Sequence, residues 1–594
     1  MGLAHRRLSI IDLSRHGHQP MHFAGCRLVY NGEFYNYRSI RKELESRGHR
    51  FHGCSDSEVL LHGWVEWGDG ILERINGIYA FAVWDGKSRT LLLARDPMGV
   101  KPLYYTETTS GFAFASELKA LTALPDLDRS IDPQAVDACL GHLWLPSPST
   151  MFRAVRKLEP GHLLAVRDGR IVSRRPPHAP PFIPTPGQQT EYPRRAAAER
   201  LSEQLDRAVR RQLVSDVPVG AFLSGGLDSS AVVALARRRL DRLPCFTITF
   251  RDRSMADEGF ADDLPYARRV ARHLGVTLHE VEVGAALIDG LEQMVWQLDE
   301  PQADPAPLQA ALICRAAHEA GIKVLLSGTG GDDLFTGYRR HRALLLERWW
   351  RWWPAAIRRR LQRFAATLPH SSGTGRRIAR AFRFAGVDEE ERIVGYFRWL
   401  DPERQRCLYS PEFRDAVGTP APLRDFLRTL PDGLTPLQRM LALEQRFFLA
   451  DHNLNYTDKS GMAYGVEVRV PLLDLELVRF ANRLPDRYKQ RGATGKWLFK
   501  QAMEGVLPRE VIHRPKTGFG APVRRWLHHD LREMVGDLLS EEGIRRRGWF
   551  DPQAVRRMIA DDAAGRIDAA YSIFAMLCME LWCRRFVDRR QEWG

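Results

Sequence analysis

The hydrophobic pattern changes character near residue 194. Before that point, short apolar runs separated by turn residues predict a β-rich domain with a sandwich of sheets. The expected strands are 8–11, 27–30, 78–84, 90–94, 111–115 and 162–166. Two segments with one apolar face, 37–46 and 57–67, predict amphipathic helices that interrupt the strands.

Beyond residue 194, apolar runs of strand length alternate with segments of helical period. The expected strands are 217–223, 245–250, 278–283 and 322–326. The expected helices are 196–213, 229–240, 264–274, 287–298 and 308–320. This alternation predicts a doubly wound parallel sheet, which binds its ligand at the carboxyl ends of the strands. From residue 339 onwards the pattern is mostly helical and predicts a helical extension.

A proline-rich stretch separates the two patterns. Residues 173–193 contain seven prolines, a density that excludes helices and inner strands and favours a stiff linker. The chain of 594 residues is also too long for a single core. We therefore expect an α/β multidomain protein, with domains at 1–172 and 194–594 joined by this linker.

Composition restricts the partners more than the fold. The net charge of +14 comes mostly from arginines scattered along helices, without a basic tail or an aromatic RNA-binding signature, so we expect an anionic substrate and no nucleic acid. Eight single cysteines without a CxxC pair indicate neither zinc nor disulfides and suit a reducing cytoplasm. Without a long apolar run or a signal-peptide pattern, we expect a cytoplasmic protein with no membrane partner.

One loop gives the strongest chemical signal. Ser224-Gly225-Gly226-Leu227-Asp228-Ser229 follows an expected buried strand and leads into a helix. Glycines and the N–H groups of a helix N-terminus let a phosphate approach the backbone closely. Asp228 alone would repel phosphate, so its presence indicates Mg²⁺ between carboxylate and phosphate. The alternative is an ordinary Ser/Gly turn that caps a helix.

A second loop of similar chemistry follows the expected strand 322–326. It reads Ser327-Gly328-Thr329-Gly330-Gly331-Asp332. Because the carboxyl ends of parallel strands lie at one edge of a sheet, we expect the two loops to meet. Asp228 and Asp332 could then share one Mg²⁺–pyrophosphate, with ATP and Mg²⁺ as the expected cofactors.

Both loops resemble known signatures. The first resembles the SGGxDS loop of ATP pyrophosphatases, which split ATP into AMP and pyrophosphate to adenylate a substrate. Residues 327–338 resemble the second signature of the asparagine synthetase C-terminal domain. The segments 456–459, 466–474, 495–498 and 514–519 resemble the same domain. The resemblance implies an ATP-pyrophosphatase type of sheet with C-terminal helices.

The resemblance also implies roles for particular residues. The pyrophosphate loop would consist of Ser224, Gly225, Gly226, Asp228 and Ser229. The rest of the nucleotide site would consist of Phe222, Ile248, Ser327 and Gly328, the first two beside the adenine and ribose. Lys496 would face the acyl-adenylate and stabilise charge on phosphorus, although it could also be an ordinary surface lysine. Residues 299–301 and 304–305 match a motif beside the acceptor site.

The N-terminal part resembles a class II glutamine amidotransferase domain, the glutaminase half of glutamine-dependent asparagine synthetase. The matching segments are 7–12, 30–36, 55–56, 77–81, 95–105 and 114–117. The resemblance implies an Ntn-type αββα sandwich and a glutamine pocket. Arg7 would hold the glutamine α-carboxylate. Asn31 and Gly32 would form the oxyanion hole, and Glu33 and Asp56 would hold the α-amino group.

This part departs from the family in its nucleophile. The family uses an N-terminal Cys, whereas this sequence begins Met-Gly-Leu, and Cys26 and Cys54 are internal residues that we expect in the core. Either the natural chain begins upstream at a Met-Cys, or the glutaminase is vestigial and the enzyme uses free ammonia or another amine. We favour the first explanation, because an incomplete sandwich leaves sheet edges unpaired. For the sequence as written, we expect no glutaminase activity.

A second departure concerns the acceptor. Asparagine synthetases have Glu where this chain has Thr329, which cannot act as a carboxylate base. The expected reaction adenylates a carboxylate, aspartate or related, and transfers ammonia from solution or glutamine to give an amide. The alternatives are a ligase or cyclase acting on a sugar acid or peptide carboxylate, and a non-catalytic scaffold, against which Asp228, Asp332 and Lys496 argue. A homodimer is left open.

The stretch 349–354, Trp-Trp-Arg-Trp-Trp-Pro, fits neither signature. It is compatible with an interfacial or partner-binding helix. It is also compatible with aromatic packing inside the helical layer, and we favour packing.

Overall fold

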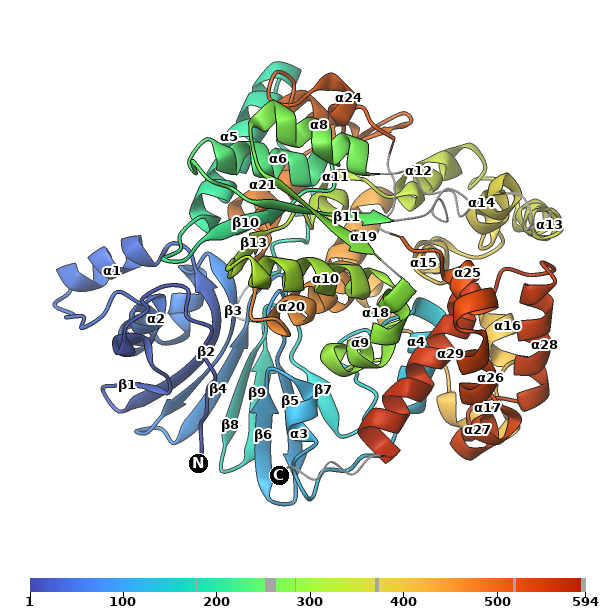
Figure 1. Ribbon diagram of the computed structural model, residues 1–594, viewed down its shortest axis with the longest axis horizontal. Helices are drawn as coiled ribbons and strands as arrows, with labels where there is room; N and C mark the ends of the chain where they lie inside the picture. The colour runs from blue at the N-terminus through green and yellow to red at the C-terminus, as the bar shows by residue number, and fades with distance from the viewer. Residues whose placement is uncertain (177–178, 251–262, 284, 369–372, 516–519, 589–594) are drawn as a thin grey trace.

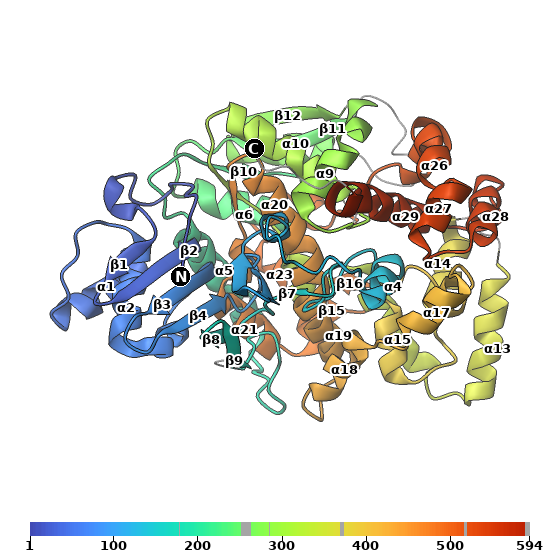
Figure 2. The same ribbon diagram turned by 90° about the horizontal axis from the view of Figure 1, so that it is seen from below.

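A computed structural model describes residues 1–176, 179–250, 263–283, 285–368, 373–515 and 520–588 of the protein. Figure 1 shows three regions, with the N-terminal strands at lower left, a second sheet above them and a layer of helices at right. In Figure 2, seen from below, the N-terminal strands and the helix α13 (Ala355–Ala366) again lie at opposite ends. No helix in the described part of the chain is long and apolar enough to cross a bilayer.

The N-terminal region contains two antiparallel sheets packed face to face. The larger sheet has the order β1 (Met21–Phe23), β2 (Cys26–Phe34), β3 (Gly77–Asp85), β4 (Thr90–Arg95), β8 (Leu163–Arg167), β9 (Arg170–Arg175). The smaller has the order β6 (Gly111–Ala115), β5 (Tyr104–Thr108), β7 (Val155–Lys157). Val29, Leu93 and Leu158 belong to one apolar cluster that joins the sheets. The helix α2 (Asp56–Trp67) packs on β2, and α1 (Tyr37–Ser46) packs on α2.

The expected strand at 8–11 is wrong, although Ile10 and Ile11 are buried. This segment uses its backbone to join the two halves of the chain instead of pairing in a sheet. The backbone N–H of Asp216 donates to the Ile10 carbonyl at 3.0 Å. The backbone N–H of Asp12 donates to the Asp216 carboxylate at 2.8 Å.

The second sheet is fully parallel and has the order β12 (Leu278–Val283), β11 (Cys245–Phe250), β10 (Val219–Phe222), β13 (Val324–Leu326), β14 (Glu467–Arg469). The strand order reverses direction between β10 and β13, and such a switch point is where open α/β sheets bind ligands. Val219 lies opposite Val324, and Ala221 lies opposite Leu326, so the two strands end at the same level. The sequence pattern had predicted four of these five strands.

Helices cover both faces of this sheet. One face packs on α5 (Arg194–Gln212), α6 (Leu227–Arg237) and α8 (Leu264–Leu274), and the other on α10 (Ala306–Glu319) and α20 (Asn455–Met462), as Figure 1 shows. Val324 and Leu326 belong to the apolar cluster that also contains residues of α5 and α6, whereas Leu325 belongs to the cluster that contains residues of α10. This alternation follows from the two-residue period of a strand. The doubly wound arrangement places both loops of interest at one edge.

Many of the remaining helices form the layer at the right of Figure 1, and others lie beside the two sheet regions. They include α3 (Leu118–Leu121), α4 (Pro133–His142), α9 (Leu291–Leu298), α11 (Gly331–Phe335), α12 (Arg339–Leu346), α14 (Gly373–Phe382), α15 (Glu389–Gly395), α16 (Pro402–Arg406), α17 (Pro411–Val417), α18 (Pro422–Thr429), α19 (Pro436–Leu443), α21 (Leu475–Arg483), α22 (Asp486–Lys489), α23 (Trp497–Ala502), α24 (Arg509–Ile512), α25 (Val523–Arg525), α26 (Arg532–Leu538), α27 (Glu541–Arg547), α28 (Pro552–Ala563) and α29 (Ala570–Cys583). A short hairpin, β15 (Gln490–Arg491) and β16 (Thr494–Gly495), precedes α23. Buried α29 packs in one cluster with N-terminal residues such as Tyr104 and Leu140.

Three sequence-based expectations need correction here. The expected linker begins inside β9, which continues to Arg175 because its residues pair with β8. Cys54 is exposed, since the turn before α2 places it outside the core, while Cys26 is buried as expected. Of the tryptophans at 349–353, Trp350 is buried, but Trp349 is 64% and Trp352 75% exposed. Aromatic packing therefore does not account for the whole stretch.

Candidate active site

The first loop turns sharply between β10 and α6. Gly225 has φ +67°, and a Cβ there would lie 2.6 Å from the backbone carbonyl carbon of Tyr266, so the position requires glycine. Ser224 and Ser229 approach across the turn, with 3.1 Å between their hydroxyl oxygens. Asp228 lies in the first turn of α6, where backbone N–H groups have no partner within the helix.

The second loop lies directly against the first. A Cβ added to Gly328 would be 2.5 Å from the backbone nitrogen of Ser229, and one added to Gly331 would be 2.5 Å from Asp228 Cγ. The glycines therefore allow two backbones and one carboxylate to occupy the same edge of the sheet. The two loops are about a hundred residues apart in the sequence, and the pairing of β10 with β13 brings them together.

Lys496 joins the two loops. Its ammonium group forms ion pairs with both Asp228 and Asp332 and is almost fully buried. Burial alone would lower the pKa of Lys496, but the two carboxylates outweigh it and hold the pKa above its ordinary value. The backbone of Lys496 is left-handed, with φ 53°, and its N–H donates to the Phe335 carbonyl at 2.8 Å. An ordinary surface lysine is excluded.

The other predicted nucleotide residues lie around these loops. Phe222 ends β10 and Ile248 lies in the neighbouring strand β11, both partly buried. The hydroxyl oxygens of Ser327 and Thr329 are 2.8 Å apart. Sequence reasoning assigned no role to Arg514, which donates to the Ser224 carbonyl at 3.2 Å and pairs with Asp263. Residues 516–519 of the same motif lie outside the described part of the chain.

The convergence of two carboxylates on one cation fits the chemistry of Mg²⁺, which prefers oxygen ligands. In the described residues, no group of three or more His, Cys, Asp or Glu side chains forms a complete metal site. Mg²⁺ held by one or two carboxylates completes its shell with water and phosphate oxygens. Asp228 and Asp332 are therefore suited to a metal that arrives with a nucleotide.

The predicted glutamine pocket brings Glu33 and Asp56 into one buried electrostatic cluster. Asp56 accepts hydrogen bonds from the Tyr30 hydroxyl at 3.0 Å and from the backbone N–H of Phe34 at 3.1 Å. Burial nonetheless raises the pKa of Asp56 to about 6. Burial, together with Asp56 and Glu467, also raises the pKa of Glu33 well above its ordinary value. Two acids held this way favour a cationic ligand.

The other three predicted pocket residues are less directly connected. The Arg7 guanidinium donates to the carbonyls of Ile11 at 2.6 Å and Asp12 at 2.9 Å. Asn31 and Gly32 lie within β2, and the Asn31 amide donates to the Ser116 hydroxyl at 3.4 Å.

The seam between the domains contains a second buried lysine between carboxylates, which sequence reasoning did not single out. Lys101, before β5, is fully buried and lies 2.8 Å from Asp458 and 3.7 Å from Glu467. Arg469, two residues along β14, lies 2.8 Å from Glu467 and 3.8 Å from Glu33. The backbone N–H of Ser327 donates to the Arg469 carbonyl at 2.8 Å, so Glu33 and the second loop contact the same strand. A lysine within the mostly apolar stretch 97–105 was the available signal.

The motif expected beside the acceptor site contributes to the same seam. Asp299 is fully buried, lies 2.9 Å from Lys119 and also pairs with Lys459. Glu300 lies 3.0 Å from Lys157. Both carboxylates therefore hold lysines of the N-terminal domain. Asp304 differs, since it is partly exposed and lies 3.0 Å from the His452 ring.

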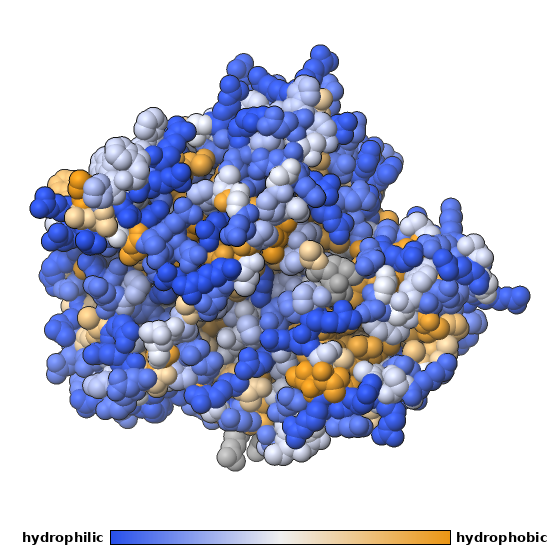
Figure 3. Space-filling model, turned by 180° about the vertical axis from the view of Figure 1, so that it is seen from behind, coloured by the Kyte–Doolittle hydropathy of each residue, from blue (hydrophilic) through white to orange (hydrophobic). Residues whose placement is uncertain are grey.

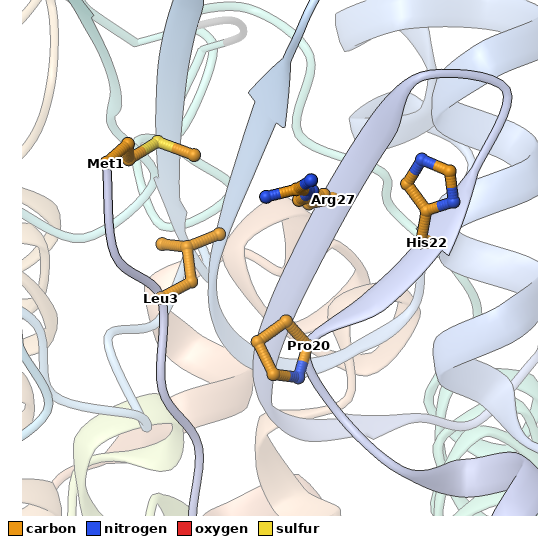
Figure 4. Close-up of a pocket in the computed structure, with 5 residues that line it drawn as sticks. All are labelled: Met1, Leu3, Pro20, His22 and Arg27. Carbon is orange, nitrogen blue, oxygen red and sulfur yellow. The ribbon is translucent and has the colours of Figure 1, made fainter.

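One surface pocket lies away from these groups. Figure 4 shows Met1 and Leu3 facing Pro20, His22 and Arg27 beside β1 and β2. Its lining contains no carboxylate, thiol or hydroxyl side chain. These five side chains do not form a metal ligand set.

Comparisons with known proteins agree with this arrangement. Residues 200–584 match the family model "Asparagine synthase", and residues 1–176 match "Glutamine amidotransferase domain". A putative glutamine-hydrolyzing asparagine synthetase of Mycobacterium tuberculosis H37Rv is 35% identical, covering 98% of this chain and 88% of the relative.

Two further relatives show the range of the family. Asparagine synthetase [glutamine-hydrolyzing] 1 of Bacillus subtilis is 30% identical, covering 99% of this chain and 90% of its own. "Amidase chry2" of Gibberella zeae is 28% identical, covering 94% and 86%. The chain belongs to the asparagine synthase family of ATP-dependent amidotransferases, in which a glutamine amidotransferase domain precedes the synthase domain.

Proposed function

We propose that the protein activates a carboxylate with ATP and converts it to an amide. A carboxylate oxygen of the acceptor attacks the α-phosphorus, and pyrophosphate leaves. Ammonia then attacks the acyl carbon, and AMP leaves with the electron pair of the broken C–O bond. The observation that carries this proposal is the joint contact of Lys496 with Asp228 and Asp332, on loops at the switch point of the sheet.

The residues of the site divide the work. The glycine loop 224–226 and the N-terminus of α6 are suited to the pyrophosphate oxygens. Asp228 and Asp332 would hold Mg²⁺, which neutralises charge on the leaving pyrophosphate when bound. Lys496 would then stabilise the negative charge that develops on the α-phosphoryl oxygens. Phe222 and Ile248 would form the wall beside the adenosine.

The acceptor is proposed to lie along a chain of polar side chains that starts next to Lys496. Gly337 packs against both Asp332 and Lys496, and Tyr338 follows it. The Asn453 amide donates to the Tyr338 hydroxyl at 3.2 Å, and the His452 ring lies 2.8 Å from the Asn453 oxygen. Asp304 closes this chain at the His452 ring. Of these groups, the Tyr338, Asn453 and His452 side chains can donate to a carboxylate without the Glu that Thr329 replaces.

Thr329 favours a second candidate, in which the acceptor is not aspartate. The Thr329 hydroxyl is engaged with Ser327, and its backbone N–H donates to the Ser327 hydroxyl at 3.2 Å. Aspartate has a second carboxylate that the site must also bind. A sugar acid or a peptide carboxylate does not require such a second binding group. The same fold and the same adenylation serve both candidates.

One experiment tests both parts of the proposal. Exchange of labelled pyrophosphate into ATP is measured with aspartate, a uronic acid and peptide carboxylates in turn. Exchange that depends on one class of carboxylate is the expected result and identifies the acceptor. A complete lack of exchange and of AMP formation with every carboxylate would support a non-catalytic scaffold instead.

The ammonia is proposed to come from glutamine bound at Glu33 and Asp56 if the natural chain carries the N-terminal Cys that this sequence lacks, and otherwise directly from solution. The support is the pair of buried acids beside β2, which suits the α-ammonium group of an amino acid. Measuring amide formation with glutamine and with ammonium salts distinguishes the two sources.

A further inference from the structure

Exposed apolar side chains gather in one part of the helical layer. Of the ten large hydrophobic residues that are exposed in the described chain, six lie between residues 346 and 378. They are Leu346, Trp349, Trp352, Ile357, Phe364 and Ile378, with exposures from 40% to 75%. Single exposed apolar residues are ordinary, but a contiguous group marks an interaction surface.

The same segment is strongly cationic. Residues 339–366 contain nine arginines and one acidic residue, Glu347. Glu347 is buried and lies 2.9 Å from Arg392, so it does not offset the surface charge. The exposed arginines of the segment are Arg339, Arg342, Arg348, Arg351, Arg359, Arg360 and Arg363.

The two kinds of side chain share one fixed helix and the turn before it. On α13, Ile357, Leu361 and Phe364 are spaced as neighbours on one face. The Arg358 guanidinium donates to the carbonyls of Trp353 at 3.1 Å and Ala385 at 2.8 Å, which holds α13 against the following helical turn. The Trp-Arg surface, defined as the exposed residues of 342–364, is therefore a built feature of the fold.

This surface lies far along the molecule from both sheets. Figure 1 places α13 and α14 at the right-hand extreme, and in Figure 3, which shows the opposite side, apolar residues at the left-hand edge are surrounded by hydrophilic ones. The arrangement of an apolar face, tryptophans and flanking arginines is typical of helices that lie in the interface of a bilayer.

We propose that the Trp-Arg surface docks the protein on an anionic membrane surface. Ile357 and Phe364 would enter the acyl boundary, Trp349 and Trp352 would lie at the headgroups, and the exposed arginines would face lipid phosphates. Charge complementarity selects this occupant, because a second copy of so cationic a face would be repelled. This proposal replaces the sequence-based expectation that the protein has no membrane partner.

Co-sedimentation of the full chain with vesicles tests the proposal. The protein should bind vesicles that contain phosphatidylglycerol, bind pure phosphatidylcholine vesicles about tenfold more weakly or worse, and lose the difference at high salt. Trp352→Ser/Phe364→Ser and Arg359→Gln/Arg360→Gln should each weaken binding about tenfold or more. Val172→Ser/Arg170→Gln changes exposed residues on β9 and should bind like the parent.

The remaining outcomes overturn the proposal. Equal binding to both vesicle types, or unchanged binding by the two variants, would exclude this surface as a membrane site. A dimer in the parent that becomes a monomer in the Trp352→Ser/Phe364→Ser variant would assign the surface to a second copy. Tight binding of RNA or an acidic peptide, without binding to vesicles, would assign it to a polyanion. Unchanged pyrophosphate exchange in each variant serves as the check of folding.

Discussion

The nucleotide loops and the domain seam contain the same charge arrangement in different settings. In each, a buried lysine lies between two carboxylates: Lys496 with Asp228 and Asp332, and Lys101 with Asp458 and Glu467. In both, burial lowers the lysine pKa, but the carboxylates raise it by a larger amount, so the pKa lies above its ordinary value. Charge and burial alone therefore do not distinguish a catalytic cluster from a structural one.

The difference lies in the backbone that holds each cluster. The seam cluster is held by β14, α20 and the segment before β5, so its partners are fixed by regular hydrogen bonding and Lys101 has no exposure. The loop cluster is held by glycine turns after two strands and by a left-handed lysine. A ligand can take the place of the lysine beside the carboxylates only where the backbone leaves room for the ligand to reach them. We infer that the seam cluster around Lys101 stabilises the domain interface and that the loop cluster around Lys496 takes part in the reaction.

The largest expected effect is a loss of activity when the loop cluster is changed. Asp228→Ala removes one of the two carboxylates proposed to hold Mg²⁺ and should reduce pyrophosphate exchange by about 10³-fold. The free energy of unfolding should change little, because Lys496 keeps Asp332. Near-normal exchange in this variant would refute the assigned role of Asp228.

The corresponding change at the seam should act on stability. Lys101→Met leaves Asp458 buried without its cation, while Glu467 keeps Arg469, and should lower the free energy of unfolding by about 3 kcal/mol or more. Urea unfolding measures this, and Lys87→Met, at an exposed position on the turn after β3, is the matched control. A stable Lys101→Met protein that cannot perform pyrophosphate exchange would reverse the roles of the clusters.

A glycine substitution sharpens the role of the backbone. The Cβ of Gly331→Ala would meet Asp228 and push the loops apart, so exchange should fall about tenfold and the KM for ATP should rise. Gly536→Ala, in α26, meets no atom within 4 Å and should leave both quantities unchanged. Equal kinetics in the two variants would show that close contact of the loops is not needed.

The smallest expected effect is a pH dependence at the glutamine pocket. Since the pKa of Asp56 is raised to about 6, glutamine affinity should fall by up to about tenfold per pH unit below pH 6, as the carboxylate becomes neutral. Folding stability should respond with the opposite sign. The folded state binds the proton more tightly than the unfolded state, so the cost of ionised Asp56 disappears as the pH falls from 6 towards 3.8. Calorimetric titration of glutamine across this range measures the first effect, and flat affinity would contradict it.

The sequence predicts the parallel sheet better than the clusters. The strands β10, β11 and β13 are mostly apolar runs, as expected for strands covered on both faces, whereas the edge strand β12 alternates apolar and polar residues. The short strands β5 and β7 lack such a run and escaped prediction. The run at 8–11 misled, because an extended apolar segment can be buried without pairing in a sheet.

Partners in the ion clusters could not be predicted, because they depend on how the domains pack. Lys101 and Asp458 are 357 residues apart, and Asp228 and Lys496 are 268 apart. The local sequence pattern of the glycine loops indicated Asp228 and Asp332, whereas the sequence around Lys101 has no comparably specific pattern. The Trp-rich stretch shows the same limit, since its pattern allowed both burial and exposure.

The most direct test of the central claim is a double-mutant cycle of pyrophosphate exchange with Asp228→Asn and Asp332→Asn. If both carboxylates serve one nucleotide-bound metal, each single change should remove most of the exchange and the double change should cost little more. Losses that multiply independently, or full exchange in either single variant, would contradict a shared site.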